Sequence, residues 1–232
     1  MLWGVLLLAG SLFKVEETLD RKQRQPRLGA AITDMFRELT NARFLTLSLS
    51  MAFIMGGFFS YLAASPFVFQ SIYGYSALEY SVVFAFNATV ISAVALLAVR
   101  LSRRLGDRRI VRGSCSVMFL AGMGMLAVAC LTPDSSLPAL VSLTLFVSVL
   151  GASQTAGFGI VMASRSGGAG AASGIFGVLC FLFGALMSPL VGLMGETSML
   201  PLALCLVVSA LISFILFNLG LKLKQPLTKE IL

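Results

Sequence analysis

The sequence has no histidine, few charged residues and only four scattered cysteines. Charged residues make up 12% of the chain, against about a quarter of a soluble domain. No two cysteines form a Cys-x-x-Cys pair, so a zinc site has no plausible set of ligands. No serine lies in a nucleophile elbow, and no glycine loop precedes a Lys-Ser or Lys-Thr pair. The sequence therefore predicts neither an enzyme nor an ATP-driven pump, and it predicts no bound cofactor.

Long apolar runs dominate what remains. Hydrophobic residues reach 58% of the chain, and six runs each exceed the roughly 20 residues of helix that cross a hydrocarbon core of about 30 Å. Five of the six runs are clear. The remaining one, residues 169–194, is rich in glycine and alanine but carries no charge. The runs cover residues 44–69, 79–101, 110–131, 138–163, 169–194 and 197–220. We expect an all-α membrane protein with six spanning helices.

The basic residues indicate how these spans are oriented. All 17 lysines and arginines lie within 14–43, 100–112, 165 and 222–229, and the other connections contain none. With six spans these two sets of loops alternate sides, so every basic residue lies on one face, which the positive-inside rule assigns to the cytoplasm. A net charge of +7 is also typical of proteins that bind nucleic acid. We predict no nucleic-acid partner, because the charges fall in short bursts between apolar runs.

The chain begins with the apolar segment MLWGVLLLAGSLF, residues 1–13. It is too short to cross a membrane, and basic residues follow it rather than precede it, unlike a signal peptide. We expect the cytoplasmic end of a truncated helix, so that the chain is a fragment or starts at an internal methionine. A short interfacial or re-entrant segment is the alternative.

Residues 14–43 form the only long loop. Its second part places one set of residues on an apolar helical face and another set opposite. The apolar set is Ile32, Met35, Phe36 and Leu39, and the opposite set is Asp34, Arg37 and Glu38. The pattern fits a helix on the inner membrane surface or a plain linker helix.

Polar and aromatic residues within the spans are the candidates for a substrate cavity. Each polar group in a membrane costs free energy unless it faces protein or water, so Asn87 and Gln154 indicate function or a helix-to-helix hydrogen bond. Nearby aromatic side chains fit an apolar or cationic ligand, although lipid contact and core packing explain them as well. The predicted cavity residues are Phe58, Tyr61, Ser65, Asn87, Gln154, Phe158 and Phe176.

No Asp, Glu, Lys or Arg lies in the middle of any predicted span. Such a residue costs about 2.5–3.5 kcal/mol at the centre of a spanning helix. A proton-coupled carrier normally needs a carboxylate in the membrane. If the chain belongs to such a carrier, the residue that couples transport to protons lies in a missing part of the protein.

Three stretches resemble a known family. FFSYLAASPFVFQSIYGYSALEYSVVFAFNA, residues 58–88, resembles the seventh and eighth helices of Bcr/CflA-type drug-resistance transporters in the major facilitator superfamily. LSRRLGDRRIVRG, residues 101–113, is similar to the superfamily's Gly-x-x-x-Asp-Arg loop, and GALMSPLVG, residues 184–192, to its glycine-proline antiporter motif. The matching residues are Gly106, Asp107, Arg108 and Arg109 in the loop, and Gly184, Pro189 and Gly192 in the second motif.

The resemblance implies the carboxy-terminal half of a proton-coupled drug antiporter in a bacterial inner membrane. Residues 1–13 would end helix six, 14–43 would be the cytoplasmic central loop, 44–220 the six-helix domain and 221–232 a cytoplasmic tail. The amino-terminal half, with the acidic residues that carry protons, would be missing, and the substrate would be an amphipathic, drug-like compound driven out by the proton gradient. The loop would act as a conformational latch through Asp-Arg pairing and bonds to helix C-termini. The alternatives are a homodimeric half-size carrier and a non-transporting membrane fragment or interaction partner.

Overall fold

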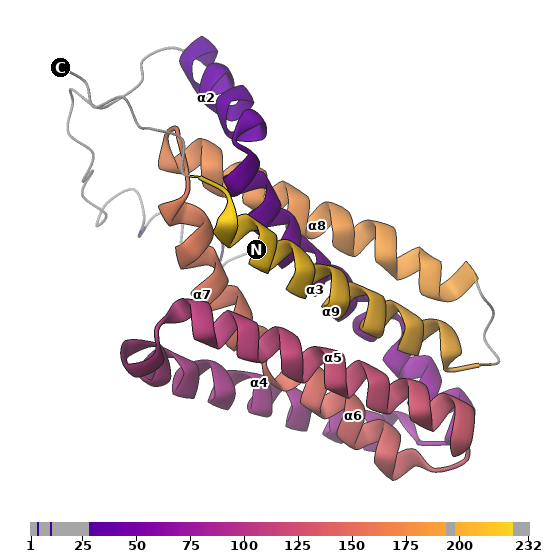
Figure 1. Ribbon diagram of the computed structural model, residues 1–232. Coiled ribbons are helices and arrows are strands. Elements are labelled where there is room, and N and C mark those ends of the chain that lie inside the picture. Colours follow the sequence, from indigo (N-terminus) through magenta and orange to yellow (C-terminus); the bar gives the residue numbers. More distant parts are fainter. Residues whose placement is uncertain (1–3, 5–9, 11–27, 194–197, 225–232) are drawn as a thin grey trace.

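The computed structural model describes residues 4, 10, 28–193 and 198–224, and the elements of its two long segments are helices. Apart from Gly4 and Gly10, the predicted truncated helix at 1–13 lies outside the described residues, as do the first part of the central loop and the end of the tail. Figure 1 shows the arrangement. The elements are α2 (Leu28–Thr40), α3 (Ala42–Phe67), the π-helix η2 (Val68–Ile72), α4 (Ala77–Leu105), α5 (Asp107–Leu131), α6 (Ser136–Ser148), α7 (Leu150–Ala163), α8 (Ala169–Leu193) and α9 (Leu200–Lys222).

Six stretches of helix in the described part of the chain are long and apolar enough to cross a membrane, as the sequence predicts. The first span is longer than expected, because α3 begins at Ala42 and continues past Pro66 through the π-helical turn to Ile72. The run predicted at 138–163 forms one span that is interrupted at Val149, between α6 and α7.

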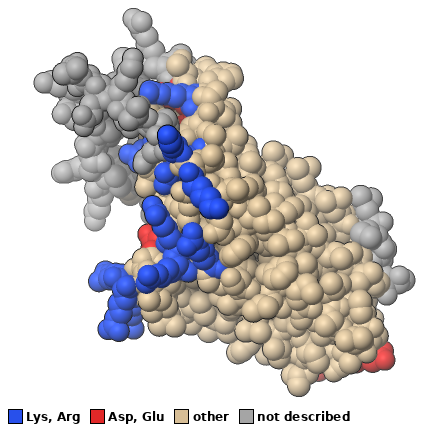
Figure 2. All heavy atoms as spheres, viewed as in Figure 1, with Lys and Arg blue, Asp and Glu red and all other residues tan. Residues whose placement is uncertain are grey.

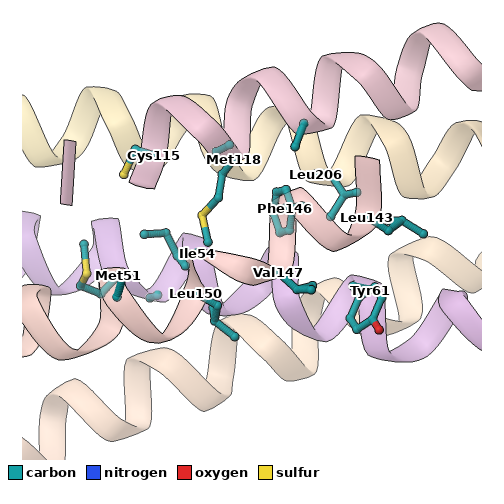
Figure 3. Packing of buried hydrophobic residues seen from close by; sticks show 14 of the residues in the cluster. Met51, Ile54, Tyr61, Cys115, Met118, Leu143, Phe146, Val147, Leu150 and Leu206 are labelled. Atoms are coloured by element: carbon teal, nitrogen blue, oxygen red, sulfur yellow. The ribbon is translucent and has the colours of Figure 1, made fainter. Parts of the chain in front are cut away.

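The core lies around α3, which packs against α7, α8 and α9. On the other side of the bundle α5 packs against α6, α7 and α9, and α4 packs against α6 and α7. Buried side chains from these helices meet in one hydrophobic cluster, which includes Ile54, Met118 and Phe146 (Figure 3). Since α3 contributes the most buried span, the fold is organised around this helix.

The described lysines and arginines gather at one end of the bundle (Figure 2). Here α2, the α4–α5 turn, the α7–α8 turn and the end of α9 lie together, and Arg43 donates a hydrogen bond to the Leu223 carbonyl at 3.2 Å. We call this the basic end of the bundle. Its position agrees with the loop alternation that the sequence predicts.

Two helices bury much less of their surface than the others. In the most apolar stretch of α4 only 11% of the residues are buried, and in that of α8 22%, whereas the other four spans bury 39–61%. Large apolar side chains therefore point outward from both helices. The exposed residues include Leu78, Val82, Phe86, Leu96 and Leu97 on α4, and Val178, Phe181, Leu182 and Leu186 on α8.

Candidate functional site

A chain of hydrogen bonds joins three helices inside the bundle. The Asn87 side-chain amide on α4 donates to the Tyr61 hydroxyl on α3 at 2.9 Å, and the Thr144 hydroxyl on α6 donates to the Asn87 side-chain oxygen at 2.8 Å. Tyr61 is 2% exposed and Asn87 1%. In hydrocarbon a polar side chain must find a partner within the protein, and here Asn87 uses both ends of its amide to do so.

The position of Asn87 explains how α4 attaches to the bundle. Asn87 and Ala98 are the only buried residues of this helix. The apolar side chains of α4 that pack against the core near Asn87, such as Val83 and Ile91, are only partly buried, whereas Asn87 is fully buried and hydrogen-bonded. We infer that the hydrogen bonds fix the rotation and depth of a helix whose apolar surface would otherwise suit several positions.

The other predicted cavity residues fall into two groups. Ser65 and Phe58 lie near the network on α3: the Ser65 hydroxyl is 2.9 Å from the Tyr80 hydroxyl, and the Phe58 ring stacks on the Tyr61 ring with centroids 6.2 Å apart. Gln154, Phe158 and Phe176 form a second group between α3, α7 and α8. The Gln154 amide donates to the Met51 carbonyl at 3.3 Å, and the rings of Phe158 and Phe176 meet edge to face at 5.3 Å.

These two groups differ in how open they are. Tyr61, Asn87 and Ser65 are buried and Phe58 is partly buried. In the second group Phe158 is 41% exposed, and Gln154 and Phe176 are partly exposed. The structure thus brings the predicted residues together in one deep polar cluster and one more accessible aromatic surface. That any of them contacts a substrate stays a prediction.

The turn between α4 and α5 holds the predicted latch residues. Gly106 ends α4 with φ +82°, and its amide donates to the Ser102 carbonyl at 2.8 Å. Asp107 begins α5, where the helix dipole favours a carboxylate, and it accepts a hydrogen bond from the Ser102 hydroxyl. The turn therefore links the end of one helix to the start of the next.

Asp-Arg pairing, which the resemblance implies for this turn, does not occur among the described residues. Asp107 is held by Ser102, and Arg108 and Arg109 are exposed. Both arginines directly follow Asp107 on α5, and side chains one or two positions apart on a helix do not face each other. Asp107 and Ser102 also border a pocket of about 310 Å³ between α4, α5 and α7. A latch function of the turn stays a prediction.

We expect replacement of Gly106 by alanine to destabilise this turn. The φ of +82° with ψ 147° lies in a region that is essentially restricted to glycine, and non-glycine residues there cost about 1–3 kcal/mol. An added Cβ meets nothing within 4 Å, so the cost comes from the backbone alone. Thermal unfolding of Gly106→Ala in detergent should show a lower midpoint. Gly113→Ala, which also adds a Cβ in open space but within α5, should not, and equal midpoints would contradict the argument.

The glycine-proline motif on α8 is only partly packed within this chain. A Cβ on Gly184 would lie 2.6 Å from the ring of Phe59, so this glycine allows α3 and α8 to approach closely. A Cβ on Gly192 meets nothing within 4 Å, and α8 continues past Pro189 to Leu193. Gly184 therefore has a packing role here, and the antiporter role of the motif stays a prediction.

Aromatic residues close the end of the bundle opposite the basic end. Phe69 on η2 is buried among the rings of Tyr73, Tyr75 and Tyr80, with centroids 5.5–6.2 Å away. Burial, with smaller contributions from Tyr75 and Asp134, raises the pKa of the Tyr73 hydroxyl above the ordinary tyrosine value. Tyr73 therefore stays neutral at physiological pH and donates to the Met199 sulfur at 3.2 Å.

Comparison with known proteins decides the family. The family model described as Major Facilitator Superfamily matches residues 1–189, which is most of the chain. The chain belongs to the major facilitator superfamily. It is 29% identical over 219 residues to an uncharacterized MFS-type transporter, YdgK, of Bacillus subtilis, covering 94% of this chain and 54% of that protein. It is also 24% identical over 224 residues to a bicyclomycin resistance protein homolog of Haemophilus influenzae, covering 94% of this chain and 56% of that protein.

The chain thus spans about half the length of the curated relatives that it matches. Its six spans agree with this coverage, since major facilitator transporters consist of two six-helix halves. The predicted fold, a six-helix half of the major facilitator superfamily, is confirmed, and so is the assignment to transporters rather than enzymes. The chain is a multi-pass membrane protein.

Several residues of the described structure were not anticipated from the sequence. Thr144 completes the Asn87 network, and Tyr80 pairs with Ser65. Glu38 belongs to the predicted polar face of the central-loop helix, but its residue pattern does not indicate that it is fully buried. A hydroxyl in the middle of an apolar span was the one available signal for Thr144.

Proposed function

We propose that the chain is the carboxy-terminal half of a proton-coupled multidrug efflux antiporter that works by alternating access. Three facts support this function: the resemblance of residues 58–88 to drug-resistance transporters, the relative named for bicyclomycin resistance, and the match to about half of each relative. In this superfamily the substrate binds between two six-helix halves that rock against each other.

The observation that carries the proposal is the exposure of α4 and α8. Since α4 packs on α7, α7 on α3 and α3 on α8, these four helices form a row with α4 and α8 at its two ends. The helices behind the row, α5 and α9, bury 39% and 44% of their most apolar stretches, about twice or more the share in α8 and α4. A second six-helix unit laid across the row would cover the two exposed helices.

The accessible aromatic surface lies in the same row. Gln154 and Phe158 on α7 and Phe176 on α8 are partly or well exposed. Gln154 donates to a backbone carbonyl of α3, and the two phenylalanine rings meet edge to face. Aromatic faces with a few polar groups suit an amphipathic or cationic drug-like substrate. In our proposal these three residues contact the substrate, and Phe58, Tyr61, Ser65 and Asn87 shape the wall behind them.

Proton coupling is assigned to the other half in this proposal. None of the six apolar runs has a carboxylate near its middle, and acidic residues within the membrane carry protons in such carriers. The basic end would face the cytoplasm of a bacterial inner membrane, as the positive-inside rule requires.

A drug-efflux assay in a pump-deficient bacterium tests the proposal. We expect no efflux from this chain alone and clear efflux from the chain joined to an upstream six-helix half, with membrane expression matched in both strains. A fusion carrying a second copy of this chain in place of the upstream half controls for added membrane protein.

Two outcomes would contradict the proposal. Efflux by this chain alone, together with crosslinked dimers in the membrane, would indicate a half-size homodimeric carrier that uses the same exposed faces. An inactive fusion that is well expressed would indicate a non-transporting membrane protein or interaction partner.

A further inference from the structure

The helix that precedes the first span is held to the bundle by its carboxylates. Glu38 on α2 is fully buried, and one of its oxygens accepts hydrogen bonds from the backbone amides of Ser166 at 2.6 Å and Gly167 at 2.5 Å. Asp34, one turn earlier, accepts from the amide of Gly168 at 3.1 Å. Three successive amides of the α7–α8 turn are thus bound by two side chains of one helix.

These amides lie where unpaired donors would otherwise be expected. They immediately precede α8, which begins at Ala169, and the first amides of a helix have no partner within it. Hydrogen bonds from such amides to a carboxylate are charge-assisted and stronger than those between neutral groups. The α2 carboxylates therefore cap a helix that lies more than 125 residues later in the chain.

Asn41 completes the contact between α2 and the turn. Its side-chain amide donates to the Ser164 carbonyl at 2.8 Å and to the Ser166 hydroxyl at 2.6 Å. Its side-chain oxygen accepts from the Phe44 amide and so caps α3. One residue thereby connects the start of α3 to the turn before α8.

We propose that α2 is a strap that ties the start of α8 to the start of α3 at the basic end, and that the Glu38 carboxylate closes it. The strap makes the cytoplasmic ends of these two spans a single unit. It is a property of this six-helix half and does not depend on drug export. The residues between the two halves of such a transporter thus include a structural element that belongs to this half.

Replacement of Glu38 by alanine leaves the amides of Ser166 and Gly167, which are half-buried, without their acceptor. Glu38→Gln retains an uncharged oxygen in the same place and should weaken the strap less. Glu79→Ala is a matched control, because Glu79 caps α4 at the opposite end of the bundle.

Disulfide crosslinking measures whether the strap is closed. A Cβ on Gly167 would lie 3.3 Å from the Asp34 Cβ, close to the roughly 3.5–4.5 Å of a disulfide. The pair Asp34→Cys and Gly167→Cys, made in the full protein with Cys130→Ser and Cys205→Ser, should oxidise readily in native membranes. The control pair Phe36→Cys and Gly167→Cys should not, because Phe36 is 65% exposed on the opposite face of α2.

Addition of Glu38→Ala to the first pair, which already lacks the Asp34 carboxylate, should slow its crosslinking, because the loss of the remaining charge-assisted bonds shifts the strap toward its open state. With Glu38→Gln the crosslinking rate should lie between those of the first pair alone and the pair with Glu38→Ala. Glu79→Ala should leave the crosslinking rate unchanged. Failure of the first pair to crosslink, or a rate that Glu38→Ala does not change, would overturn the proposal.

Hydrogen exchange gives a second test without new cysteines. In Glu38→Ala the amides of residues 166–168 should exchange about tenfold faster than in the parent protein, and those of the α4 start should not change. Unchanged protection at 166–168 would overturn the strap even if the cysteine variants fail to fold.

Discussion

Replacing Asn87 by leucine is expected to lower the free energy of unfolding by about 2–4 kcal/mol. The substitution keeps the number and branching of the side-chain heavy atoms but removes both hydrogen bonds that join α4 to α3 and α6. It leaves the hydroxyls of Tyr61 and Thr144 without this partner, and a buried unsatisfied polar group costs roughly 1–3 kcal/mol. Hydrogen bonds between membrane helices lie at the low end of such energies, so we expect the loss of both bonds to cost no more than about 2–4 kcal/mol in total.

Gln154→Ala is the matched control for the Asn87 substitution. Gln154 is also an amide in the middle of a span, but it is partly exposed and makes a single bond of 3.3 Å to a backbone carbonyl. We expect little loss of stability from Gln154→Ala, measured as the midpoint of thermal unfolding in detergent. In an active fusion the same substitution should change which drugs are exported. Similar losses of stability from both substitutions would show that burial of Asn87 has no special role.

Hydropathy and charge carried enough information to predict the spans. A run of more than 20 apolar residues has few alternatives in a membrane, and the alternation of basic loops fixes which ends share a face. The apolar runs at 79–101 and 110–131 therefore appear as α4 and α5. The split of the fourth span at Val149 was not predicted, because residues on both sides of it are equally apolar.

The neighbours of each span were much harder to predict. Lipid is as apolar as the side chains of the spans. Hydropathy therefore predicts which segments insert into the membrane, but not which helices pack together. The cost of a buried amide singled out Asn87, but nothing local to it indicates Thr144 as its partner 57 residues away. Glu38 binds backbone amides, and these do not depend on which side chains a segment carries. The residue pattern therefore does not indicate the partners of Glu38.

Replacing Gly57 by alanine is the second substitution with a large expected effect, about 2–3 kcal/mol. Gly57 lies on α3 against Phe146 of α6 and Ser209 of α9. An added Cβ would come within 2.5 Å of the Ser209 hydroxyl and 2.9 Å of the Phe146 ring. Ser209 and Phe146 are 0% and 1% exposed, so neither has open space to move into. Overpacking of this kind typically costs 1–3 kcal/mol, and here it acts on two helices at once.

The adjacent glycine separates packing from helix propensity. Gly56→Ala brings the same gain in helix propensity as Gly57→Ala, about 1 kcal/mol for alanine over glycine. Its new Cβ would lie 2.9 Å from a carbon of the Met187 side chain, which is flexible and only partly buried, and should therefore cost much less. Ser209→Ala added to Gly57→Ala removes the closest contact and should recover about half of the lost stability, since coupling between touching residues is of order 0.5–3 kcal/mol. If instead the two glycine variants unfold at the same temperature, the close approach of α9 to α3 at Ser209 is not what limits this position, and the packing around α3 is looser than the structure indicates.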